Sequence, residues 1–184
     1  LSEISGVAVP AKIERQRAQL LDAMVDTHFM TGFLRVALAL EPDLLKGFAD
    51  LFAGMGAEVV TAVTPARAEV LGSVSCQAVQ IGDLEACEQA AATSGAQLLV
   101  GNSHGDTLAK RLSIPLLRAG FPLYDCVGGY ARGWVGYRQS RQALFDIANL
   151  FLGQHHELPA YRSIYRTDAM PAALRTQAGA GLVH

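Results

Sequence analysis

Five short apolar runs alternate with helical segments along most of the chain, and this alternation limits the possible folds more than any other feature. The expected strands cover residues 34–40, 57–63, 77–82, 97–101 and 115–119. The first run reads LRVALAL and is so uniformly apolar that it favours a central strand covered on both faces. Strands separated by helices of roughly 8 to 14 residues are typical of parallel sheets with right-handed crossovers. The sequence therefore predicts an α/β fold, a Rossmann-like three-layer sandwich around a mostly parallel five-stranded sheet.

Start and stop signals place the helices between these strands. A long helix is predicted over residues 10–30, and a helix with the clearest amphipathic stripe follows Pro42. Thr64 and Pro65 predict a short helix to about residue 71, and Asp83 predicts the cap of a helix to about residue 94. The stripe after Pro42 consists of Leu44, Leu45, Phe48, Leu51, Phe52 and Met55, and Ile13, Arg17, Leu20, Leu21, Met24 and His28 share helical spacing in the first helix.

One domain is predicted between two irregular ends. Residues 1–9 are expected to be a linker, residues 10–153 the Rossmann-like domain, and residues 154–184 a tail with no long apolar stripe. The last predicted helix covers residues 136–152 and is expected to bury Leu144, Ile147, Ala148 and Phe151. The chain begins at Leu1 rather than Met, so we expect it to be part of a longer protein.

Composition excludes several classes of function. With 184 residues, 51% of them apolar, and a net charge of −2, the chain can bury a proper core. It has no Lys/Arg block, which argues against nucleic-acid binding, and no apolar run of about 18 residues, which argues against a membrane span. Three widely spaced cysteines favour a reducing compartment, so we expect a cytoplasmic protein. Cys87 lies on the apolar face of its predicted helix and is expected to be a core residue.

Common catalytic motifs are missing from the sequence. There is no GxGxxG after the first strand, no phosphate loop with GK[ST] and no GxSxG. Cys76 and Cys126 belong to no CxxC pair, and His155 and His156 are expected to be exposed in the tail. We therefore assign no catalytic residue and no metal ligand.

The polar turn after the fourth strand is the first candidate binding site, because open α/β sheets bind ligands beyond the carboxyl ends of their strands. It contains Asn102, Ser103, His104 and Gly105. Ser103 and Asp106 fit a capping box, and the backbone N–H groups there could also face an anion, so both interpretations stay open. No carboxylate or cysteine lies at a recognisable metal spacing from His104, which favours a solvated loop histidine.

Charged residues after the fifth strand form the second candidate group. Arginine side chains there can bind anions bidentately, or they can form ion pairs with Asp125 and Asp146. Both alternatives stay open. The candidate binding or interface residues of this segment are Arg118, Asp125, Arg132, Tyr137 and Arg138.

Three sequence blocks carry a resemblance to a known family. They are QRAQLLDAMVDTHFMTG at 16–32, GNSHGDTLAKRLSIPLLRAGFPLYD at 101–125 and VGYRQSRQALFDIANLF at 135–151. Together they resemble the C-terminal domain of β-type subunits in the nitrogenase component 1 family. Within that family the blocks resemble the N subunit of the scaffold that assembles the iron–molybdenum cofactor. Cys126 and Ala131 depart from the family pattern, in which Arg often follows the Asp and a His-Arg pair precedes the GY turn.

The resemblance implies a scaffold role. Complete subunits of the family resemble three Rossmann-like domains, and the scaffold is an α2β2-type complex of E and N subunits in which an iron–sulfur precursor is matured with molybdenum and homocitrate. The cluster ligands of β-type subunits belong to an N-terminal domain that this chain lacks. We therefore expect no cofactor in this chain, and iron–sulfur clusters in the full complex through other regions. We also expect a partner E subunit, no nucleic acid and no membrane.

Three hypotheses of function follow. The first is a non-catalytic scaffold domain that pairs with the E subunit. The second is the C-terminal domain of a catalytic nitrogenase β chain, or of a subunit like that of dark protochlorophyllide reductase. The third is a free-standing Rossmann-like domain that binds a small anion near Ser103 and Arg118.

Overall fold

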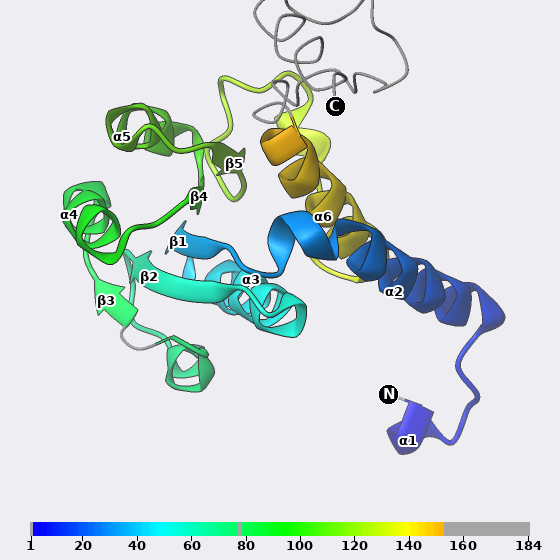
Figure 1. Ribbon diagram of the computed structural model, residues 1–184. Helices are drawn as coiled ribbons and strands as arrows, with labels where there is room; N and C mark the ends of the chain where they lie inside the picture. The colour runs from blue at the N-terminus through cyan, green and yellow to red at the C-terminus, as the bar shows by residue number, and fades with distance from the viewer. Residues whose placement is uncertain (1, 77–78, 153–184) are drawn as a thin grey trace, which may run out of the picture. The chain divides into compact units, whose positions relative to one another are not determined.

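The computed structural model describes residues 2–76 and 79–152 and contains a single parallel sheet between two layers of helices (Figure 1). The strands are β1 (Arg35–Ala39), β2 (Glu58–Thr64), β3 (Val79–Ile81), β4 (Leu98–Gly101) and β5 (Leu116–Arg118). The α-helices are α1 (Ser2–Ser5), α2 (Ala11–Thr31), α3 (Pro42–Met55), α4 (Leu84–Ser94), α5 (Asp106–Leu112) and α6 (Tyr137–Leu152). Three 3₁₀ turns, η1 (Glu69–Ser73), η2 (Ser103–Gly105) and η3 (Gly129–Ala131), lie in the connections. The predicted tail at 154–184, with His155 and His156, lies outside the described residues.

The sheet has the strand order β3-β2-β1-β4-β5, and every neighbouring pair is parallel. This confirms the predicted α/β fold. The chain moves outward from β1 through β2 to β3, and then returns to the other side of β1 for β4 and β5. The reversal next to β1 is the topological switch point at which open α/β sheets most often bind ligands.

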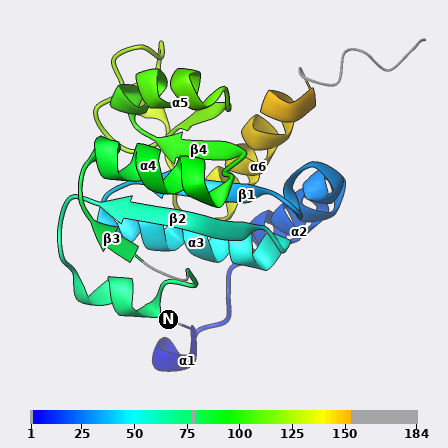
Figure 2. The ribbon, with the colours of Figure 1, turned by 60° about the vertical axis from the view of Figure 1, so that its left-hand side comes forward.

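Helices cover both faces of the sheet, as the turned view shows (Figure 2). On one face α3 and α6 bury Phe52 and Ile147 against Leu38 of β1. On the other face α4 and α5 close a second cluster that contains Cys87, Leu99 and Leu108. Cys87 is fully buried, which confirms its prediction as a core residue. Burial of these side chains, worth about 1.5 to 3 kcal/mol each before ordering entropy, fastens the helices to the sheet.

Several helix ends follow their sequence signals. Gly56 and Gly95 end α3 and α4 in left-handed conformations with φ of 83° and 65°, which a residue with a side chain rarely adopts. The carboxylate of Asp83 accepts hydrogen bonds from the N–H groups of Glu85 and Ala86, 3.1 and 3.0 Å away, and so caps α4. The predicted stripe of α3 is largely confirmed, with Phe48, Phe52 and Met55 among its buried residues.

The short helix predicted from Thr64 to residue 71 is wrong. Thr64 is the last residue of β2 and is paired with Ile81 of β3, and only the 3₁₀ turn η1 follows at Glu69–Ser73. Pairing in the sheet extends through the residue whose type favours a helix cap, because tertiary context overrides local propensity. The third predicted run forms β3, in which Gln80 and Ile81 are exposed because β3 is an edge strand.

The apolar spacing predicted for the first helix does not mark its buried side. The buried residues of α2 are Ala23, Thr27 and Thr31, whereas Ile13 and Leu21 are exposed. The helix α2 lies beside α6 (Figure 1). The two buried threonine hydroxyls donate to backbone carbonyls of α2 itself, 2.7 and 2.9 Å away, so they need no polar partner elsewhere.

Candidate functional site

Asn102 joins the loops that follow β4 and β5. Its Oδ1 accepts a hydrogen bond from the N–H of His104 at 3.1 Å, and its Nδ2 donates to the carbonyl of Phe121 at 3.0 Å. Asn102 is therefore the capping residue of the turn that opens α5, and of the two interpretations left open for Ser103 the capping one does not hold. The N–H of Ser103 donates to the carbonyl of Pro122 at 3.1 Å, which adds a second link between the loops.

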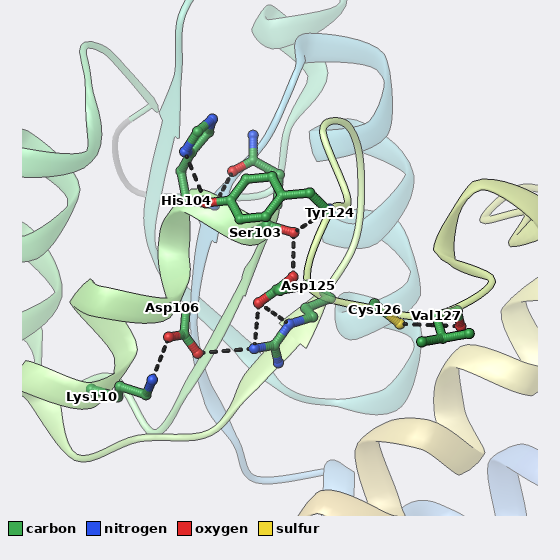
Figure 3. Close-up of polar contacts among 10 residues, drawn as sticks. Ser103, His104, Asp106, Lys110, Tyr124, Asp125, Cys126 and Val127 are labelled. Atoms are coloured by element: carbon green, nitrogen blue, oxygen red, sulfur yellow. Dashed lines mark hydrogen bonds and ion pairs between the residues drawn. The ribbon is translucent and has the colours of Figure 1, made fainter.

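Ser103 faces the protein interior instead of capping the helix (Figure 3). Its side chain is almost completely buried, and its hydroxyl donates to a carboxylate oxygen of Asp125. The same hydroxyl oxygen accepts the N–H of Tyr124 at 3.0 Å. Both hydrogen-bonding functions of a buried hydroxyl are thus satisfied, as burial requires.

Arg118 continues this set of contacts at the end of β5. Its Nε donates to Asp125 at 2.8 Å and its Nη2 donates to Asp106 at 2.9 Å. Lys110 approaches the other oxygen of Asp106 at 2.6 Å (Figure 3). We call Ser103, Asp106, Lys110, Arg118 and Asp125 the arginine network.

Contacts within the arginine network shift the pKa values of Asp125 and Arg118. Hydrogen bonds from the Arg118 guanidinium and the Ser103 hydroxyl lower the pKa of Asp125 from its ordinary value of 3.8 to about 2. The hydrogen bond to Asp125 raises the pKa of Arg118 in turn. Because two carboxylates share this guanidinium, the ion-pair interpretation holds for Arg118.

The remaining predicted residues divide between two places. Gly105 is buried at the start of α5, where an added Cβ would lie 3.3 Å from Leu99. His104 is exposed, and its Nδ1 lies 3.4 Å from the hydroxyl of Tyr124, with the two rings edge to face. The structure thus brings together Asn102, Ser103, His104, Gly105, Arg118 and Asp125 at the ends of β4 and β5.

Arg132, Tyr137 and Arg138 belong to a separate surface at η3 and the start of α6. Arg132 forms an ion pair with Asp146 at 2.8 Å, and its guanidinium carbon lies 5.7 Å from the centre of the Trp134 ring. The ion-pair alternative therefore holds for Asp146 as well. Arg138 is exposed and lines a surface groove together with Arg132 and Asp146. Tyr137 is exposed at the first turn of α6.

Sequence reasoning missed a cavity next to the arginine network. It has a volume of about 270 Å³ and lies across the carboxyl ends of β1, β2, β4 and β5, at the switch point of the sheet. We call it the edge cavity; Leu40, Glu41, Thr64, Asp83, Asn102 and Phe121 are among its lining residues. Thr64 is fully buried, and its hydroxyl has no hydrogen-bond partner among the described residues. A threonine at the end of a buried parallel strand was the available signal, and it was interpreted as a helix cap.

The described part of the chain contains no ready metal centre. Within residues 2–76 and 79–152, no three His, Cys, Asp or Glu side chains are grouped so that they could hold a metal ion. Burial raises the pKa of the Cys87 thiol to about 11, so it stays protonated at neutral pH and is a poor metal ligand. In the same part of the chain, every helix is too short or too polar to span a membrane.

Comparison with known proteins identifies the family. Residues 1–152 match the family described as Nitrogenase component 1 type Oxidoreductase. The chain belongs to this family. All three sequence blocks that carried the predicted resemblance lie inside the matched residues, and the resemblance is confirmed.

Relatives within the nitrogenase component 1 family are described as nitrogenase iron-molybdenum cofactor biosynthesis protein NifN. The protein from Mesorhizobium japonicum is 44% identical over 178 residues, covering 96% of this chain and 38% of the relative. The protein from Sinorhizobium fredii is 48% identical over 171 residues, covering 92% of this chain and 35% of the relative. The chain thus spans well under half the length of these curated relatives.

A solved nitrogenase structure has the same fold. The chain superimposes on a structure titled "Nitrogenase Cp1 at pH 6.5" with a TM-score of 0.74 and 30% identity. The match covers 83% of this chain and 36% of that one. Sequence and structure comparison thus agree on a Rossmann-like domain of a nitrogenase-type protein.

Proposed function

We propose that this chain is a domain of a NifN-type scaffold subunit and serves in assembly of the iron–molybdenum cofactor of nitrogenase. One observation carries the proposal. Several NifN proteins are 41% to 48% identical to this chain, whereas the solved nitrogenase chain is 30% identical. Within one family, the sequence is therefore closer to cofactor-assembly proteins than to that nitrogenase.

The proposed role is structural, and the chain itself is not an enzyme. The parallel sheet provides a rigid support, and the arginine network fixes the loops after β4 and β5 through contacts within the chain. Residues 102–105 and 121–130 are proposed to face other domains of the parent subunit or its partner. That partner is an E subunit in an α2β2-type assembly in the cytoplasm, and the chain is the C-terminal domain of its subunit.

Cluster ligation is proposed to lie outside this chain. The lack of a metal-binding group in the described residues and the raised pKa of Cys87 both support this. The chain, purified anaerobically, should be colourless and hold no stoichiometric iron. Reproducible one-to-one loading with an iron–sulfur cluster would overturn this part of the proposal.

A segment exchange tests the scaffold role. The matching segment of the Nostoc NifN, a relative 48% identical over 152 residues, is replaced by this chain in a host that lacks its own NifN. We expect the chimera to restore cofactor synthesis, measured by the ability of extracts to activate cofactor-free nitrogenase. A chimera that folds and accumulates but yields no active cofactor would contradict the proposal.

The catalytic alternative is tested by a parallel exchange. A nitrogenase β chain is the second candidate because the solved nitrogenase shares the fold with a TM-score of 0.74. Placing the chain in that context should give little substrate reduction if the scaffold proposal holds. Full activity there, with none in the NifN context, would favour the catalytic role. The anion-binding alternative has less support, because Arg118 is already bound by Asp106 and Asp125.

A further inference from the structure

The edge cavity has the composition of a site for a positively charged ligand. Leu40 and Val63 are buried on its walls, and Phe121 lies among its lining residues with 82% of its surface exposed. Two carboxylates, those of Glu41 and Asp83, also line it, and its described lining includes no lysine or arginine. The imidazole of His104 is the only other ionisable group in the described lining, so a phosphate or carboxylate ligand would find no lysine or arginine there, whereas a cation would find two carboxylates.

Two of its polar groups have no partner inside the described chain. The hydroxyl of Thr64 is buried and makes no hydrogen bond, which is unusual because the great majority of buried side-chain polar atoms are paired. Glu41 precedes α3 without capping it, and its carboxylate forms no hydrogen bond or ion pair with another described residue. Asp83, by contrast, is held by the N–H groups at the start of α4.

Apolar walls, an exposed ring and acidic groups together match a ligand with two parts. Leu40 and Val63 suit a short hydrocarbon or aromatic body, and the face of an exposed phenylalanine ring can attract a cation. A volume of about 270 Å³ is near the lower limit of small-molecule pockets, so the ligand must be small. We propose that the edge cavity binds a small amphipathic cation, in which an ammonium or guanidinium group is joined to a compact apolar body.

The proposal does not depend on the scaffold function. It concerns contacts made by residues at the switch point of this sheet within this chain. Failure of the segment exchange would leave it intact, and its own failure would leave the scaffold role intact.

Three probes of matched size test the charge requirement. The chain is titrated at neutral pH with 2-phenylethylammonium, 2-phenylethanol and 3-phenylpropionate, and binding is followed by NMR shifts of the cavity residues and by calorimetry. We expect saturable binding of the ammonium and at least about tenfold weaker binding of the carboxylate, because unpaired like charges repel the anion. No saturable binding of the ammonium, or equal binding of all three probes, would overturn the proposal.

Single substitutions then test the individual residues. Glu41→Gln should weaken ammonium binding about 2- to 5-fold, as for an exposed ion pair. Phe121→Ala should weaken it by a similar factor through loss of the aromatic face. Thr64→Val should weaken it about 3- to 10-fold through loss of a hydrogen bond.

A control variant separates local from general effects. Glu14→Gln removes an exposed carboxylate from the first turn of α2 and should leave ammonium binding unchanged. Equal effects of Glu41→Gln and Glu14→Gln would show a nonspecific charge effect and contradict the proposal. If Thr64→Val does not fold, Glu41→Gln and Phe121→Ala still test the proposal. Both positions are exposed, and neither side chain is part of the buried core.

Discussion

Two neighbouring polar regions at the carboxyl edge of the sheet differ in one respect, which is how completely their groups are paired. In the arginine network the hydroxyl of Ser103 donates to Asp125 and accepts from the N–H of Tyr124. In the edge cavity the hydroxyl of Thr64 is equally buried and has no partner among the described residues. Each hydroxyl lies at or just beyond the end of a parallel strand, so the difference arises from the surrounding loops.

The difference separates a structural role from a binding role. A buried polar group that is fully paired holds its loops in one conformation, and removing it leaves its partners unsatisfied. A buried polar group without a partner costs stability in the free protein and gains only when something arrives to pair with it. We therefore expect opposite responses to the loss of these two hydroxyls.

The largest effect is expected for Ser103→Ala. The substitution removes the acceptor of the Tyr124 N–H and one donor to Asp125 in a buried setting, so the free energy of unfolding should fall by about 1–3 kcal/mol. Urea denaturation measures the change. Ser75→Ala, at an exposed position, is the matched control and should change stability by less than about 0.5 kcal/mol. Equal effects of the two variants would show that the arginine network does not stabilise the fold.

Acid should weaken the arginine network next. The pKa of Asp125 is lowered in the folded protein to about 2, against 3.8 ordinarily, by Arg118 and Ser103. The stability that its ionisation contributes is therefore fully present above about pH 4 and is lost as the pH falls toward 2. Denaturation curves collected between pH 6 and pH 2 should show this loss. Asp125→Asn should remove that part of the pH dependence, and an unchanged acid response in this variant would contradict the assignment.

Thr64→Val should act in the opposite direction. Valine keeps the shape of threonine and lacks the unpaired hydroxyl, so the free energy of unfolding should rise by about 1 kcal/mol. Thr61→Val in the same strand provides the contrast, because the Thr61 hydroxyl lies 3.0 Å from that of Ser94 and its removal should lower stability. Thermal unfolding of Thr64→Val and Thr61→Val measures whether each substitution raises or lowers stability. A loss of stability in both variants would show that Thr64 has a partner after all.

Local sequence signals were sufficient to predict much of the fold. The period and length of the apolar runs predicted a parallel sheet, Gly56 marked a left-handed helix end, and Asp83 marked a cap. Each of these signals is carried by residues that lie close together in the sequence. Apolar spacing and local propensity are therefore sufficient to predict such features.

The polar pairing could not be predicted in the same way. Ser103 and Asp125 are 22 positions apart and meet only because β4 and β5 are neighbours in the sheet. The same residue types also fit a capping box, and Thr64 equally fitted a helix cap. Which side of α2 is buried depends on the close approach of α6, a helix more than a hundred residues later. Such decisions are made by tertiary contacts that a local pattern does not contain.

The smallest effect is expected for His104, which lies between the two regions. Its side chain is exposed, lines the edge cavity, and contacts Tyr124 through a long 3.4 Å approach and an edge-to-face ring contact. His104→Ala should therefore change the free energy of unfolding by less than about 0.5 kcal/mol, as for other surface substitutions. Tyr124→Phe keeps the ring contact without the hydroxyl. In a urea titration its free energy of unfolding should change as little as that of His104→Ala. A loss above about 1 kcal/mol in His104→Ala alone would mean that the imidazole is a structural partner of the arginine network. His104 would then belong to the paired region and would no longer lie between the two regions.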